Sequence, residues 1–202
     1  LRKFISSYSG IPSNDIIGLR ILKRSLDARN RNIKYNINVW FSCEEEEKKT
    51  FKKYSPAYCN VKDKPEVVIA GAGPAGLFAA LRCIELGLKP IVFDRGKKIE
   101  ERKTDIANLN KKEAVNPDSN YCFGEGGAGT FSDGKLYTRS KKRGNVEKIL
   151  NEFVYHGADE NILIDSHPHI GSDKLGPIII SIRNTLLNSG AEIYFNKRIS
   201  DI

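Results

Sequence analysis

Val67-Val-Ile-Ala-Gly-Ala-Gly-Pro-Ala-Gly76 is a short apolar run followed by three glycines at the spacing G-x-G-x-x-G. Residues 77–86 continue it with apolar side chains at helical spacing. A strand, a glycine-rich turn and a helix in this order are typical of a Rossmann-type dinucleotide site. Gly71 permits the tight turn off the strand, Gly73 lets a pyrophosphate approach the backbone, and Gly76 lets the helix pack closely on the sheet.

The residues around this turn complete the pattern. Pro74 and Ala75 open the helix, where a proline costs no hydrogen bond and the free amides and the helix dipole favour phosphate. A second apolar strand, residues 90–93, leads to Asp94, which lies 18 residues after Gly76. A carboxylate at this spacing accepts hydrogen bonds from an adenosine ribose. We therefore expect the five turn residues Gly71, Gly73, Pro74, Ala75 and Gly76 to bind a diphosphate, and Asp94 to bind the ribose.

The residues after Asp94 bear on the choice of cofactor. Arg95 and Gly96 follow directly and Arg102 lies a short way on, so all three are expected near the ligand. The Asp94 carboxylate would repel the 2′-phosphate of NADP, although Arg95 could accommodate it. The pattern favours FAD or NAD over NADP.

A second glycine-rich segment, residues 120–135, carries glycines at 124, 126, 127, 129 and 134 among small polar residues. Glycines and small donors let a backbone come close to a flat or phosphorylated ligand. We interpret Glu125 as an organiser of this loop, and Cys122 as a buried structural cysteine. The predicted ligand contacts in the segment are Gly126, Gly127, Ala128, Gly129, Thr130, Ser132, Asp133 and Lys135.

The rest of the chain predicts two parts. Residues 1–62 indicate a small α/β module with a helix at 1–8 and strands at 15–24 and 33–42, the second a half-buried antiparallel strand. The acidic and then basic block at 44–53 is interpreted as a linker or surface hairpin. Residues 63–202 alternate strands with helices at 146–154 and about 174–188 before a strand at 192–196. The predicted fold class is α/β, with an incomplete Rossmann-like parallel sheet after the small module.

Charge and composition leave several classes open or exclude them. Residues 1–60 hold 12 Lys and Arg against 6 Asp and Glu, so the +8 net charge belongs mainly to the N-terminal module. This basic excess keeps a nucleic-acid or protein adaptor as an alternative, without a recognised nucleic-acid motif. No apolar run reaches the roughly 18 residues needed to span a membrane. Four cysteines without a metal or disulfide spacing, and no metal-ligand cluster, indicate reduced thiols in a cytoplasm.

A family resemblance adds to these inferences. The segments 71–76 and 94–96 resemble the FAD-binding half of the glutathione reductase-like flavoprotein superfamily. Residues 123–136 and 168–173, with 20–29, are similar to the bacterial family of uncharacterised FAD-dependent, or NAD(FAD)-utilising, dehydrogenases. The resemblance implies an FAD-dependent oxidoreductase, with NAD(P)H as one electron donor and an unknown acceptor. It also implies a longer whole protein, so that residues 1–202 alone are expected to be inactive.

Two departures limit the resemblance. The superfamily usually has Glu where this chain has Asp94, which is one methylene shorter but keeps both acceptor oxygens. Gly129 and Gly134 stand where the flavin disulfide reductases carry redox cysteines, which excludes dithiol chemistry in this loop. No catalytic residue is identified, as expected where a flavin carries the chemistry. An NAD-binding dehydrogenase module remains an alternative, because it would share the three glycines and Asp94.

Overall fold

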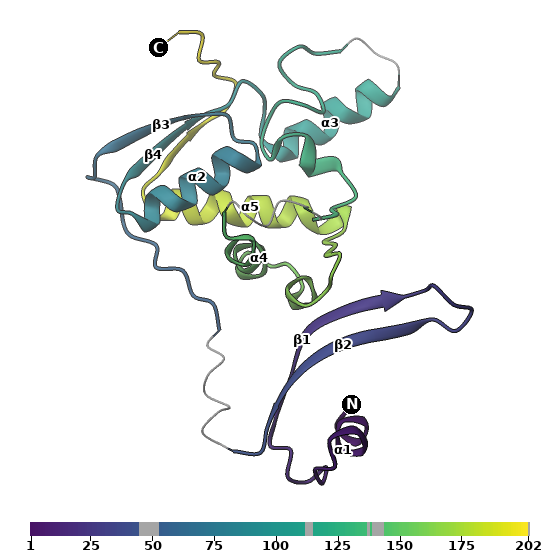
Figure 1. The fold of residues 1–202 in the computed structure, drawn as a ribbon. Coiled ribbons are helices and arrows are strands. Elements are labelled where there is room, and N and C mark those ends of the chain that lie inside the picture. Colours follow the sequence, from purple (N-terminus) through teal and green to yellow (C-terminus); the bar gives the residue numbers. More distant parts are fainter. Residues whose placement is uncertain (45–52, 112–114, 137, 139–143, 202) are drawn as a thin grey trace. The chain divides into compact units, whose positions relative to one another are not determined.

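The computed structural model describes residues 1–44, 53–111, 115–136, 138 and 144–201 (Figure 1). They form two compact units, each treated separately below. The N-terminal unit holds residues 1–44, 53–55, 138, 144–151 and 160–168, and the nucleotide unit holds 56–111, 115–136, 152–159 and 169–201. Most of the block predicted as a linker, residues 45–52, lies outside the described residues. Among the described helices, none is long and apolar enough to cross a membrane.

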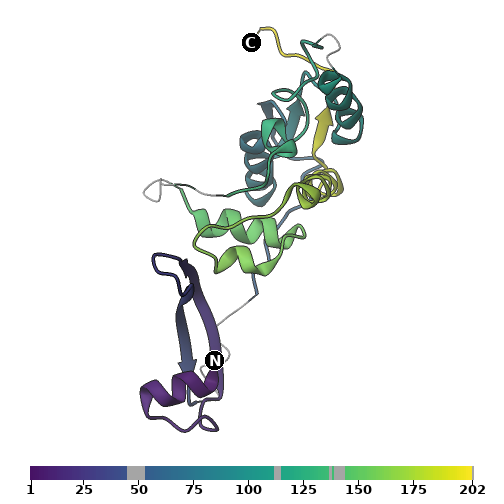
Figure 2. The ribbon, with the colours of Figure 1, turned by 90° about the vertical axis from the view of Figure 1, so that its right-hand side faces the viewer.

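The N-terminal unit is built on a β-hairpin. Helix α1 (Arg2–Ser9) precedes β1 (Gly18–Asp27) and β2 (Lys34–Ser42), which pair antiparallel with a register shift between Ile21 and Lys23. Both views show α1 beside the end of the hairpin where β1 begins and β2 ends (Figures 1 and 2). The predicted helix and antiparallel pairing are confirmed, with β1 three residues later than expected.

The expected burial of the second strand is wrong for its first half. Ile33, Tyr35 and Ile37 lie on one face by alternation, yet Ile33 is 64% exposed and Tyr35 63%. Leu26, the β1 partner of Tyr35, is also exposed. The physical reason is that, among the described residues of this unit, none covers the half of the hairpin next to its turn, where Tyr35 and Leu26 pair. We call this half the outer half of the hairpin.

One edge of β1 is extended by a later segment. Arg24 N donates to Ile164 O at 2.7 Å, and Ser166 N donates to Arg24 O at 2.9 Å. The Arg24 guanidinium also donates two hydrogen bonds to the Asp165 carboxylate, at 2.7 and 3.0 Å. This segment follows α4 (Val146–Tyr155), in which the boundary between the units falls, and η3 (Glu160–Leu163).

The nucleotide unit contains a parallel sheet in the order β3-β4-β5, formed by Glu66–Ala70, Lys89–Phe93 and Glu192–Tyr194. Helices α2 (Pro74–Glu85) and α5 (Ser172–Asn188) contact each other and the strands (Figure 1). Their inward side chains form the core: Leu77, Leu81, Ile84, Ile178, Ile182 and Leu186. The predicted α/β class, with a partial Rossmann-like sheet, is confirmed.

Helix α3 (Ile99–Asn110) was not expected from the sequence. Its apolar pattern is weak, because only Ile99, Arg102 and Ile106 are buried along 12 residues. One of those three is a charged residue, which a search for apolar periodicity does not count. Contacts with a distant loop, described below, supply what the local pattern lacks.

Candidate functional site

The first glycine turn has the geometry that the sequence predicted. Gly71 has φ of +98° and donates to Phe93 O at 2.7 Å, which closes the turn against the neighbouring strand. A Cβ at Gly76 would lie 1.9 Å from Gly71 O, so only glycine fits there. A Cβ at Gly73 would meet no atom within 4 Å, and Pro74 starts α2 directly behind it. The turn therefore leaves open space at a helix N-terminus, where a phosphate group fits.

Asp94 joins the two loops beside this turn. Its carboxylate accepts from Ala72 N at 2.7 Å and from Gly96 N at 2.8 Å, and the residue is only 6% exposed. Because each carboxylate oxygen can accept a further bond, a ribose hydroxyl can still be bound. The structure thus gives Asp94 a second role that the sequence did not indicate, as a brace between the turn after β3 and the loop after β4.

The second glycine segment lies directly on the first turn. Gly126 N donates to Ala72 O at 2.8 Å, and a Cβ at Gly127 would lie 3.3 Å from Pro74 Cδ. Gly124, Gly126 and Gly127 all have positive φ, which other residues rarely adopt. Two loops some fifty residues apart in the chain are thereby joined through their backbones.

A cleft of about 450 Å³ opens where these loops meet. Its size falls within the range of small-molecule and cofactor sites. Of the predicted site residues, eight line it: Gly71, Gly73, Pro74, Ala75, Gly76, Asp94, Arg95 and Gly127. Residues not singled out as ligand contacts also line it: Ala70, Phe93, Cys122, Phe123, Gly124, Lys197, Arg198 and Ile199.

One wall of the cleft is formed by Arg95 and Phe123. The Arg95 guanidinium lies 4.2 Å from the Phe123 ring centroid and forms an ion pair with Asp118 at 2.5 Å. Cys122, beside this wall, is exposed, so the interpretation as a buried cysteine is wrong. The sequence could not show that Asp118 and Phe123 fold back onto Arg95.

Another wall comes from Lys197, Arg198 and Ile199, which begin three residues after the end of β5 at Tyr194. Lys197 N donates to Asp94 O at 2.9 Å, which holds this segment beside the end of β4. A signal was present in the sequence, because ligands of parallel sheets bind at the carboxyl ends of strands. Lys197 and Arg198 directly follow the last predicted strand, residues 192–196, so this rule could have found them.

The other predicted contacts do not line the cleft. Gly96 is packed beneath the second loop, since its Cβ would lie 2.5 Å from Gly124 N. Thr130 and Gly126 are buried in the loop, and Asp133 pairs with Lys135 on the surface. The remaining members, Ala128, Gly129 and Ser132, lie in or next to η2 (Gly127–Phe131).

Arg102 is also absent from the lining, because it is fully buried behind the second loop. Its guanidinium donates to the carbonyls of Glu125 and Gly127 at 2.5 and 3.0 Å, and to those of Asn120 and Tyr121. Burial lowers the pKa of Arg102, against the effect of nearby carboxylates. The side chain fixes the loop from inside.

Two domain families and one bacterial protein are similar to parts or all of the chain. Residues 66–108, which contain the first turn, β4 and most of α3, match an FAD binding domain. Residues 1–42 match a domain of unknown function, DUF8436. An uncharacterized protein of Clostridium beijerinckii is 35% identical over 218 residues, covering all of this chain. The chain spans 40% of the length of that relative. Residues 66–108 are thus similar to the FAD-binding segment of flavoproteins.

Proposed function

We propose that this chain binds the ADP half of FAD in the 450 Å³ cleft and forms part of an FAD-dependent dehydrogenase. One observation carries the proposal. The second glycine loop lies on the first turn and leaves open space over Gly73. Gly73 itself belongs to residues 66–108, which match an FAD binding domain. An ordinary βαβ turn has no need of that space.

The cleft residues suit the parts of the ligand in order. The amides at the start of α2, with Gly71 and Gly73, bind the diphosphate, because the helix terminus attracts anions. Asp94 accepts from the ribose while it braces its two loops. Lys197 and Arg198 add positive charge beside the same opening.

The bound flavin would supply hydride and electron transfer, and the protein would bind and orient it. The residues of this chain hold the adenosine end, so they contribute affinity and position rather than proton transfer. A reduced nicotinamide or an organic molecule is the proposed donor. The four free cysteines favour a reducing compartment such as the cytoplasm.

The test is a visible absorption spectrum of the purified protein, followed by identification of the cofactor released on denaturation. Gly73→Val should abolish flavin retention, since a branched side chain fills the open space where the diphosphate meets the backbone. Ala79→Val is the matched control, because Ala79 is exposed on α2 and does not line the cleft.

Released FAD from the wild type and from Ala79→Val, but not from Gly73→Val, is the expected result. A colourless protein that is stabilised by NAD and not by FAD would overturn the proposal in favour of a nicotinamide site. Flavin retained by a folded Gly73→Val protein would refute the placement of the diphosphate.

A further inference from the structure

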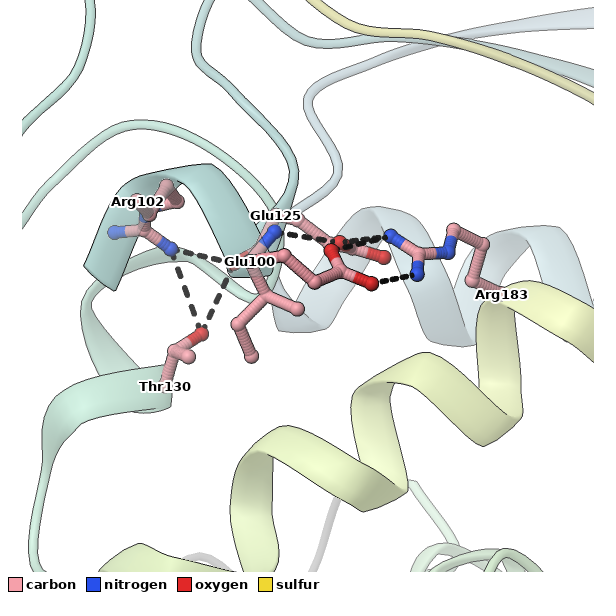
Figure 3. A network of polar contacts seen from close by, with 6 residues as sticks. Glu100, Arg102, Glu125, Thr130 and Arg183 are labelled. Carbon is pink, nitrogen blue, oxygen red and sulfur yellow. Dashed lines mark hydrogen bonds and ion pairs between the residues drawn. The ribbon is translucent and has the colours of Figure 1, made fainter. Parts of the chain in front are cut away.

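Three buried charged residues lie in or behind the second glycine loop, and none lines the cleft. Arg102 comes from α3, Glu125 from the loop, and Arg183 from α5 (Figure 3). We call these three residues the loop clasp. Burial of a charged group costs free energy unless the group is paired. Packing alone therefore does not explain why these three buried residues are charged.

The loop clasp stabilises the start of α3 through Glu125 and the second glycine loop through Arg102. The Glu125 carboxylate accepts from Ile99 N at 2.9 Å, and so caps a helix whose own N-cap, Lys98, makes no side-chain cap bond. In return, Arg102 in the first turns of α3 donates to the loop carbonyls described above. Thr130 Oγ1 adds a 3.0 Å bond to Glu125 O.

Arg183 ties the pair to α5. It donates to Glu125 Oε2 at 2.7 Å and to Glu100 Oε1 at 2.5 Å, so one guanidinium joins two carboxylates from different segments (Figure 3). Glu125 is 0% exposed, whereas the Glu100 side chain is 51% exposed. The inner contact with Glu125 is therefore the desolvated one, where an ion pair has its largest effect.

The clasp residue Glu125 stands between the glycines that shape the cleft. Gly124 and Gly127 line the cleft, and Gly126 donates the bond to the first turn. All three glycines have positive φ, a region in which glycine by itself has little preference for one conformation. Something outside the glycines must select this conformation, and Glu125 is the residue in the run with side-chain bonds to the rest of the unit.

We propose that Glu125 and Arg183 are positioning residues for the cofactor: their ion pair holds the second glycine loop against the first turn and thereby sets the affinity of the cleft for FAD. The inference rests on the proposed function. It assigns no contact with the ligand to either residue. It predicts that the clasp controls binding from behind the loop.

The charges around Glu125 give the proposal a pH signature. Burial raises the pKa of Glu125, against the effect of the Ile99 amide and of Arg183. The other charged groups that face it come from α3 and its N-cap: Lys98, Glu100 and Arg102. Without the Arg183 charge, the pKa of Glu125 would rise further. The carboxylate would then be lost at a higher pH, and FAD affinity would fall with it as the solution is acidified.

The experiment measures the Kd for FAD by quenching of flavin fluorescence in the intact protein, from about pH 8 to about pH 5. The variants are Glu125→Gln and Arg183→Gln, with Arg183→Lys as a milder change if either does not fold. Arg82→Gln is the matched control, because the Arg82 side chain is 58% exposed, pairs with Glu85 within α2 and does not line the cleft. Thermal unfolding without FAD is recorded for each protein.

We expect Glu125→Gln to weaken FAD binding on the order of tenfold or more, since a buried bond to a charged group is lost, and to flatten the dependence of binding on acid. Arg183→Gln should move the acid loss of binding to higher pH, and Arg82→Gln should match the wild type. Folded variants with wild-type affinity and pH profile would refute the clasp. Absence of FAD binding by the wild type would instead refute the proposed function.

Discussion

Gly76 and Gly73 provide opposite tests of the same turn. In Gly76→Ala the new Cβ would lie 1.9 Å from Gly71 O, about 1.5 Å short of ordinary van der Waals separation. Gly71 cannot easily retreat, because its amide is bonded to Phe93 O at 2.7 Å. Overpacking of this kind costs about 1–3 kcal/mol and sometimes more, and the clash with backbone puts the expected loss near 3 kcal/mol, the upper end of that range.

Gly73→Ala should behave differently. Gly73 has φ of −72°, which any residue can adopt, and a Cβ there meets no atom within 4 Å. Replacing glycine at such a position stabilises a protein by about 0.4–1 kcal/mol through the unfolded chain. The same methyl group would narrow the space proposed for the diphosphate, so FAD binding should weaken while the fold does not.

The assay is urea unfolding of both variants without ligand, with FAD titrations alongside. Gly76→Ala should have a lower urea midpoint than the wild type, and Gly73→Ala an unchanged or higher one. If Gly76→Ala unfolds at the wild-type midpoint, the close approach of α2 to the turn is wrong. Should Gly73→Ala lose stability instead, the open space at that position is wrong.

Three further changes test other parts of the structure. Burial lowers the pKa of His156 from 6.5 to about 4, so on acidification the unfolded chain takes up this proton at a higher pH than the folded protein does. The free energy of unfolding should therefore fall by about 3 kcal/mol as the pH drops from 6.5 towards 4. Urea unfolding of His156→Gln should not show this dependence on pH. Arg24→Ala should cost about 1 kcal/mol, because its two-bond contact with Asp165 is partly exposed, and an unchanged urea midpoint would contradict this role. Asp94→Asn should lower the unfolding free energy by about 1–3 kcal/mol, since an amide group cannot accept from both backbone amides that the carboxylate now holds; thermal unfolding at neutral pH that matches the wild type would exclude the bracing role.

The sequence predicted those parts of the fold in which local pattern and tertiary contact agree. The strand, turn and helix around Gly71 were predictable because each glycine has a local reason. Helix α3 was not, because Glu125, 26 residues after Ile99, caps its start. The exposed outer half of the hairpin was misread for the converse reason. Alternation around Tyr35 shows that a face is apolar, and it does not show whether anything covers it.

Some residues of the candidate site were likewise predictable from the sequence and others were not. Residues on the turn and at the end of β4 were placed by spacing alone. Arg102 was expected at the ligand, but it lies buried behind the second glycine loop. A sequence cannot distinguish an arginine that faces a cleft from one that binds the carbonyls of its wall. Lys197 and Arg198 reach the cleft through pairing of β5 with β4, a contact between segments about 100 residues apart.

The pairing of β5 with β4 also determines when the cleft can be completed during synthesis. Strand β4 leaves the ribosome well before β5, and roughly 100 residues at about 5–20 residues per second amount to about 5–20 seconds. During this interval one edge of β4 has no partner, and the wall formed by Lys197 to Ile199 does not exist. A nascent chain with both glycine turns already made would therefore still lack a finished cleft, and cofactor capture would have to follow the arrival of the last strand.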